Sequence, residues 1–320
     1  MISKEELADD VQALNYRSEI LEKVYQLLSV MKEITKTPYL NERLVLKGGT
    51  ALNLFFYDCI PRLSVDADLN YIGYLSKEKM REDRPIINEA MEKILIQLNM
   101  TPSRKPTHYA GGKMIWRYVS VLGQNGNLEL DLNYMYRRPL WPSKMKSPKL
   151  ARFSNLLFPV LDIHELAAGK FSALLDRDVA RDLFDSHQLF MRNDLDKEKL
   201  KQAFVVYLGM RKKSWQETCV DDIHFSVEDI RHKLIPVLQA DMIPGTKRPD
   251  IEKWGLAMME VCREGVGHLL AFNDNEKEFL TRVQTHGEIK AELLSSDPAF
   301  CAAVKEHPAL QWRAKQALVA

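Results

Sequence analysis

Two acidic residues separated by one position, Asp66 and Asp68, are the first side chains in this sequence whose spacing could support catalysis. They stand in residues 65–70, where apolar and polar residues alternate, and this period of two predicts a β-strand. Side chains two positions apart on a strand emerge on the same face, roughly 7 Å from one another. The two carboxylates are therefore predicted to lie close enough to share divalent ions. The simpler interpretation is a solvated strand face.

The segment Leu-Glu-Leu-Asp-Leu-Asn at 128–133 predicts a third carboxylate. Its leucines face one way, and Glu129, Asp131 and Asn133 face the other, so Asp131 is expected to join the pair from a neighbouring strand. Three acids at one sheet edge suit Mg²⁺, a hard cation that prefers oxygen ligands and retains water and substrate phosphates. In a two-metal site, such carboxylates stabilise the attacking and leaving oxygens of an in-line displacement.

A glycine turn precedes the acidic strand. The apolar run 44–46 ends at Lys47, Gly48, Gly49 and Thr50, and the apolar residues that follow predict a short buried helix. The free N–H groups and the positive end of that helix are suited to hold a triphosphate. A Gly-Gly pair taken alone is a weak signal, because most such pairs only form a turn.

The order of these segments carries more information than any one of them. Lys-Gly-Gly-Thr at 47–50, then eleven residues, then Arg-Leu-Ser-Val-Asp-Ala-Asp at 62–68 resembles the first motif of the polymerase-beta-like nucleotidyltransferases, specifically the AbiEii/AbiGii (MenT-like) toxin branch. Residues 165–174 with Arg177, followed by Arg-Asp-Leu-Phe-Asp at 181–185, resemble the helical motif of the same branch. Ser64 lies inside the first motif, where it either touches a phosphate or caps the turn into the strand.

This resemblance implies a fold, a reaction and further site residues. The fold is an α/β polymerase-beta-like nucleotidyltransferase core with a mixed sheet, followed by a helical C-terminal domain. Lys170 and Asp182 would complete the catalytic site with Asp66 and Asp68, while Asp185 would be structural. The reaction is Mg²⁺-dependent transfer of NMP from an NTP, and the acceptor would be the 3′ end of tRNA. The protein would be the toxin of a toxin-antitoxin or phage-defence (abortive infection) pair, with a possible cognate antitoxin protein as partner.

Positive charge is concentrated in one part of a nearly neutral chain. The formal net charge is +1, yet residues 99–161 hold only Glu129 and Asp131 as acids. The basic residues of that segment are Arg104, Lys105, Lys113, Arg117, Arg137, Arg138, Lys144, Lys146, Lys149 and Arg152. Ten positive charges against two, interleaved with aromatic residues, favour an RNA acceptor, and Arg137 and Arg138 are predicted to bind substrate. A solvated surface is the alternative.

Length and composition fit this interpretation. The chain has 320 residues, of which 46% are hydrophobic and 28% charged, which excludes disordered and collagen-like classes. Four scattered cysteines and an acidic N-terminus without an apolar core predict a cytoplasmic protein. Prolines between 139 and 159 suggest an extended connector, so we expect a nucleotidyltransferase core at 1–150 with two N-terminal helices and a helical domain at 151–320 that closes the active-site cleft.

Two other functions remain open on the sequence alone. One is a nucleotidyltransferase that modifies a protein side chain or a small molecule. The other is a non-catalytic relative that binds RNA.

Overall fold

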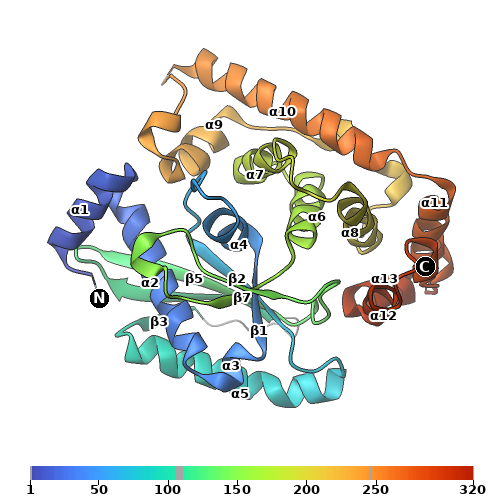
Figure 1. Ribbon diagram of the computed structural model, residues 1–320, viewed down its shortest axis with the longest axis horizontal. Helices are drawn as coiled ribbons and strands as arrows, with labels where there is room; N and C mark the ends of the chain where they lie inside the picture. The colour runs from blue at the N-terminus through green and yellow to red at the C-terminus, as the bar shows by residue number, and fades with distance from the viewer. Residues whose placement is uncertain (1, 105–110, 246, 320) are drawn as a thin grey trace. The chain divides into compact units, whose positions relative to one another are not determined.

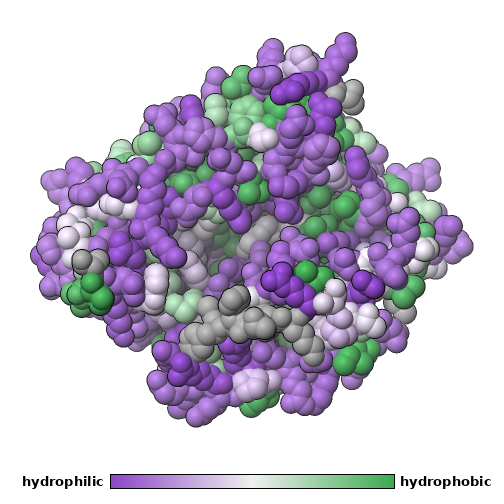
Figure 2. Space-filling model, turned by 180° about the vertical axis from the view of Figure 1, so that it is seen from behind, coloured by the Kyte–Doolittle hydropathy of each residue, from purple (hydrophilic) through white to green (hydrophobic). Residues whose placement is uncertain are grey.

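The computed structural model describes residues 2–104, 111–245 and 247–319, which form an α/β protein (Figure 1). The chain divides into two compact units. The first contains residues 1–137, 143–161 and 236–243, and the second contains 138–142, 162–235 and 244–320. No helix in the described ranges is both long and apolar enough to cross a membrane. Polar residues predominate on the face shown in Figure 2, where apolar residues gather only in small groups.

The first unit is a mixed sheet with helices packed against it. Its helices are α1 (Lys4–Leu14), α2 (Ser18–Thr35), α3 (Pro38–Asn41), α4 (Gly48–Phe55) and α5 (Lys77–Gln97). Its strands are β1 (Leu44–Lys47), β2 (Asp66–Tyr71), β3 (Thr101–Arg104), β4 (Gly111–Val119), β5 (Asn125–Asn133), β6 (Lys144–Lys146) and β7 (Phe158–Val160). Within the described part of the chain they form one sheet in the order β3-β4-β5-β2-β1-β7-β6. This arrangement confirms the expected α/β architecture with a mixed sheet.

Two central strand pairs give the sheet its mixed character. Strand β2 runs parallel to β5, and β1 runs parallel to β7, whereas the other neighbours are antiparallel. The apolar residues of β2 and β5 are buried, with Ala67 opposite Leu130 and Leu69 opposite Leu132. Because side chains alternate along a strand, burial of these residues turns the acidic residues of both strands to the opposite face.

Local signals account for the ends of several elements. Ser3 and Glu6 form a capping box at the start of α1, since each side chain accepts a hydrogen bond from the backbone N–H of the other residue. The glycine turn leads directly from β1 into α4, as predicted. Ser76 is the N-cap of the long helix α5, and its side chain accepts a hydrogen bond from the N–H of Lys79.

Asn125-Gly126, which lies between alternating segments at about 114–122 and 128–134, predicts from the sequence the turn of an antiparallel hairpin, but the predicted position of the turn is wrong. Both residues lie in β5, and the hairpin turns instead at residues 120–124. The buried Glu22 carboxylate accepts hydrogen bonds from the Ser120 hydroxyl and the Val121 N–H, and these bonds hold the turn against α2. Gly126 is required for a different reason, because a Cβ there would stand 2.1 Å from the ring of Tyr118.

The segment predicted as an extended connector contains regular structure. Strands β6 and β7 pair with each other, and β7 also pairs with β1, so residues 144–160 extend the sheet past β1. Strands of three residues lack the length needed for a visible hydrophobic period. The domain boundary near residue 150 remains a prediction.

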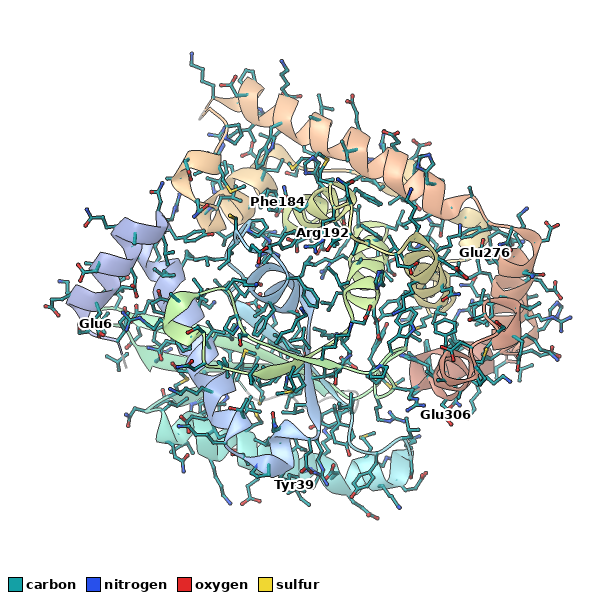
Figure 3. All side chains as sticks on the ribbon, viewed as in Figure 1. Glu6, Tyr39, Phe184, Arg192, Glu276 and Glu306 are labelled. Atoms are coloured by element: carbon teal, nitrogen blue, oxygen red, sulfur yellow. The ribbon has the colours of Figure 1, made fainter. Side chains whose placement is uncertain are left out.

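The second unit is helical among its described residues, as predicted for the C-terminal part. Its principal helices are α6 (Ile163–Leu174), α7 (Ala180–Phe190), α8 (Lys197–Gly209), α10 (Arg248–Leu270), α11 (Asp274–Thr281), α12 (Pro298–Glu306) and α13 (Pro308–Ala317). The single turn α9 (Val227–Asp229) and several short 3-10 and π segments join them. Aromatic rings fill this core: Phe171 stacks on Phe190 with centroids 4.3 Å apart, and Phe184 meets Trp254 edge to face. Phe184 is labelled in Figure 3.

Candidate active site

The carboxylates predicted from the sequence lie together on one face of the sheet. Asp68 of β2 is the register partner of Asp131 on β5, and Asp66 is the partner of Glu129. All four side chains are half-buried. Register partners on adjacent strands are about 5 Å apart, so this part of the first unit concentrates negative charge.

The glycine turn is pressed against this acidic face. Gly48 has φ +73°, a left-handed conformation that side chains disfavour, and it is the first residue of α4. A Cβ at this position would lie 2.2 Å from Oδ2 of Asp68. The backbone that opens α4 therefore approaches the carboxylate more closely than any other residue type would permit.

Thr50 fastens the turn to the acidic strand. Its side chain is fully buried, and its hydroxyl donates a hydrogen bond to the backbone carbonyl of Asp66. Asn53, one turn further along α4, donates to the carbonyl of Gly49 at 2.9 Å. The Thr50 bond fixes the start of α4 relative to β2, and the Asn53 bond reinforces the first turn of α4 itself. Ser64 is also buried, two residues before the strand begins.

Two lysines flank the acidic face. Lys47 is the register partner of Asp68 on one side, and its ammonium lies 5.3 Å from the ring centre of Tyr136. Lys113 of β4 is the partner of Asp131 on the other side, and its Nζ is 2.5 Å from a carboxylate oxygen of Glu129. The hydrogen bond to Glu129 raises the pKa of Lys113 above its usual value, against the opposing effect of partial burial.

The donor set suits a hard divalent cation. Asp66 and Asp68 supply carboxylate oxygens from one strand, and Asp131 supplies another from the next strand. Within the described ranges no three acidic, histidine or cysteine side chains are already gathered as a closed metal site. Mg²⁺ does not require one, since it is commonly held by one or two carboxylates together with water and substrate phosphates. The residues therefore fit such an ion in an open site.

In the second unit, Lys170 forms a compact ionic cluster. Its ammonium lies 2.9 Å from Asp182 and 2.7 Å from Asp185, and Arg177 contacts the other oxygen of Asp182 at 2.7 Å. The side chain of Lys170 is only 11% exposed, and those of Asp182 and Asp185 are 2% and 0% exposed. Lys170 is therefore not an ordinary solvated lysine.

The charge state of this cluster follows from its contacts. Burial tends to raise the pKa of Asp182, but the charges of Lys170 and Arg177 more than offset burial, and the pKa lies below its usual value. Asp182 is thus an ionised carboxylate with two cationic partners. Asp185 has the most buried carboxylate of the group, in keeping with the structural role expected for it.

Glu165, which leads the helical motif, is a buried carboxyl group. It accepts hydrogen bonds from the N–H of Leu140 at 3.0 Å and from the hydroxyl of Tyr207 at 3.1 Å. Burial raises its pKa to about 8, although both hydrogen bonds act in the opposite direction. Glu165 therefore anchors residues 138–142, a short strap that belongs to the second unit, to α6.

The predicted substrate-binding arginines differ in their surroundings. The guanidinium of Arg137 is buried and donates to the backbone carbonyls of Leu75 and Tyr134. Arg138 is partly exposed and lies 3.3 Å from Glu306. Arg137 therefore has a structural task, and its contact with substrate remains a prediction.

Other basic residues of the segment are more accessible. Lys144 and Lys149 are exposed, Lys149 is 2.8 Å from Asp58, and Lys146 lies over the ring of Phe56. Trp116, Tyr118 and Tyr134, which the sequence places among these residues, are buried in the core. Lys105 and Tyr109 lie outside the described residues.

Sequence reasoning counted Lys113 as one basic residue among ten and did not place it at the site. The signal that would have placed it is the β4–β5 register, which the misplaced turn concealed. The sequence also did not predict that Glu165 binds the strap, because a contact between residues 25 apart leaves no local pattern.

Comparison with known proteins agrees with this geometry. No curated protein matches the chain. Among solved structures, MenT4, a nucleotidyltransferase toxin from Mycobacterium tuberculosis H37Rv, is similar over 98% of this chain and 99% of its own, with a TM-score of 0.59 and 16% identity. Similarity at this identity shows a shared fold. A family model described as "Nucleotidyl transferase AbiEii toxin, Type IV TA system" matches residues 30–261, well over half of the chain. The chain therefore belongs to the AbiEii family of nucleotidyltransferase toxins of type IV toxin-antitoxin systems.

Proposed function

We propose that this toxin transfers a nucleoside monophosphate from an NTP to the 3′ end of tRNA in the cytoplasm, with Mg²⁺ as its metal ion. One observation carries the proposal: Asp66, Asp68 and Asp131 share a face of the sheet directly beside the glycine turn that opens α4. Carboxylates beside a phosphate-binding helix end are what transfer of a nucleotide requires.

Nucleotidyltransferases generally use a divalent metal ion. In this chain Asp66, Asp68 and Asp131 would hold Mg²⁺, which when bound would neutralise charge on the phosphate oxygens. The backbone N–H groups of Gly48 and Gly49 would bind the triphosphate at the start of α4. Lys47, Thr50 and Ser64 would support that site, with Thr50 acting through its bond to the Asp66 carbonyl.

The reaction is an in-line substitution at phosphorus. The 3′-hydroxyl oxygen bonds to the α-phosphorus, and the bond from that phosphorus to the oxygen that bridges the α- and β-phosphates breaks. Pyrophosphate leaves with that oxygen, and the hydroxyl proton passes to solvent water. Lys170 would supply positive charge to the nucleotide phosphates, and Asp182 would hold its ammonium in position. In this proposal the helical domain, 151–320, closes the cleft of the core, 1–150, when substrate binds.

The excess of basic residues in 99–161 supports an RNA acceptor. Arg138 is the better placed of the two predicted arginines, because its side chain is 37% exposed and that of Arg137 is buried. A cognate antitoxin is the partner that the family implies.

Incubation of the purified protein with total RNA and each labelled NTP tests the proposal. We expect label at the 3′ end of tRNA, loss of labelling with EDTA, and a loss of several orders of magnitude in Asp68→Asn. Asp274→Asn, which alters a fully exposed acid, serves as the matched control and should label normally. Label on protein or on a small molecule would favour another acceptor. RNA binding without any label would favour the non-catalytic alternative.

A further inference from the structure

A row of charged residues crosses four adjacent strands beside the glycine turn. Register pairs Lys113 of β4 with Asp131 of β5, Asp131 with Asp68 of β2, and Asp68 with Lys47 of β1. Partners in register project from the same face of a sheet. The row therefore reads positive, negative, negative, positive, with Asp66 and Glu129 on the next row of the same face.

Four carboxylates crowd two neighbouring rows of this face: Asp66, Asp68, Glu129 and Asp131. Lys113 has the shortest described contact of the group, 2.5 Å from Nζ to Glu129, and its side chain is 47% exposed. A protonated amine at this position reduces the mutual repulsion of the carboxylates.

We propose that Lys113 is a built-in counter-ion of the carboxylate face, which competes with the divalent cation and thereby sets the affinity of the metal site. The inference rests on the metal site of the proposed function. Lys113 lies outside the glycine turn, the acidic strand and the helical motif, so none of these assigns it a role.

The physical argument is competition between like charges. An ammonium that contacts Glu129 and stands in register with Asp131 repels an incoming divalent cation. Removal of its charge should therefore tighten cation binding by about tenfold, less at high salt. An NTP brings negative charge to the same face, and its phosphates can pair with Lys113. The lysine should therefore weaken binding of the cation alone and oppose binding of a cation with nucleotide much less. Lys113 is in this sense a positioning and selectivity residue.

Binding of Mn²⁺ in the absence of nucleotide gives a direct readout that does not depend on turnover. Free Mn²⁺ is measured by electron paramagnetic resonance during titration of the full-length protein with manganese chloride. The variants are Lys113→Gln, which removes the charge, and Lys113→Arg, which retains it. Lys93→Gln is the matched control, because it removes a lysine that likewise pairs with one glutamate, Glu89, on the surface of α5. Asp68→Asn reports on the metal site itself.

We expect Lys113→Gln to bind Mn²⁺ about tenfold more tightly than the wild type, and Lys113→Arg and Lys93→Gln to bind as the wild type does. The gain should shrink when a non-hydrolysable NTP analogue is present. Unchanged or weaker Mn²⁺ binding by folded Lys113→Gln, with binding lost in Asp68→Asn, overturns the counter-ion role and leaves the metal site intact. Mn²⁺ binding that Asp68→Asn does not weaken overturns the metal site, and the role of Lys113 with it.

Discussion

Gly48 is constrained both by its backbone conformation and by its proximity to Asp68, a predicted metal ligand. Its positive φ is open to glycine at little cost, and the absence of a Cβ lets the start of α4 lie against Asp68. Gly48 is therefore required both for its positive φ and for its close approach to Asp68. Gly123, in the hairpin turn, is required only for its φ of +88°, because a Cβ there would have no neighbour within 4 Å.

The pair of glycines makes a controlled experiment. Both Gly48→Ala and Gly123→Ala should lose about 1 kcal/mol of stability from the strained backbone. Only Gly48→Ala should also displace the Asp68 carboxylate, and we expect its nucleotide transfer to fall by at least about a hundredfold. Chemical unfolding and initial rates measure the two effects separately. Equal activity in the two variants would mean that the turn does not position Asp68 for catalysis.

Lys170 combines a structural and a chemical task. It is the shared cation of two buried carboxylates, Asp182 and Asp185, so Lys170→Ala should leave both without their common partner. We expect a loss of about 3 kcal/mol of stability, much more than a solvated lysine would cause, together with loss of transfer. Lys277→Ala, which removes an exposed lysine of the same unit, should change stability by less than about 0.5 kcal/mol.

A double variant separates the two tasks of Lys170. Lys170→Ala with Asp185→Asn removes one positive and one negative charge, so part of the lost stability should return while transfer stays absent. Calorimetry and transfer assays on the same preparations give this comparison. Recovery of activity along with stability would assign Lys170 a purely structural role.

At the scale of elements, Glu165 connects α6 to the strap at 138–142. The pKa of its carboxyl is about 8 in the folded chain and near 4.5 when unfolded. A carboxyl group whose pKa is raised by folding contributes stability that is fully present below about pH 4.5 and is lost as pH rises through about 8. Above that pH the strap would be anchored by a buried charge.

This linkage predicts a pH-dependent loss of stability. The unfolding temperature of the wild type should fall by several degrees between pH 6 and pH 9, and Glu165→Gln, which cannot ionise, should fall much less. Glu306→Gln is the matched control, because Glu306 is an exposed carboxylate that contacts the same strap through Arg138. Glu306 is labelled in Figure 3. Parallel curves for the wild type and Glu165→Gln would show that another group governs this pH range.

Elements with a strong local pattern were predictable, and their partners were not. The alternation at 65–70 and the Gly-Gly turn identified β2 and the start of α4, because each depends on residues close in sequence. The β4–β5 register was missed. A two-residue turn at 125–126 pairs residue 124 with residue 127, and hence residue 120 with Asp131, whereas the structure pairs Lys113 with Asp131.

The cause of this error is a tertiary contact. Asn-Gly is a strong local signal for a tight hairpin, but Glu22 lies 98 residues before Ser120 and binds a different turn. A distant buried carboxylate outweighed the local preference. The same reason explains Lys170, whose burial depends on how α6 and α7 pack rather than on the residues beside it.

At the scale of the whole molecule, the distribution of charge distinguishes the possible acceptors. The net charge is +1, yet ten of the 45 basic residues and only two of the 44 acidic residues fall in 99–161. Several of these basic residues, among those that the structure describes, have different surroundings. Arg137 is buried, Arg152 pairs with Glu6 and Asp10, and Lys144, Lys146 and Lys149 lie on and just after β6.

The three lysines at β6 provide the test of an RNA acceptor. If they neutralise phosphates, RNA affinity should fall steeply with salt, and each Lys→Gln change should flatten the log-log slope by somewhat under one. The triple variant should add nucleotides to RNA poorly while it binds NTP normally. Lys290→Gln with Lys315→Gln, two exposed lysines of the second unit, should leave the slope unchanged. A small-molecule acceptor predicts no such salt dependence. Unchanged RNA affinity and unchanged nucleotide addition in the triple variant would therefore favour an acceptor that has no phosphate backbone.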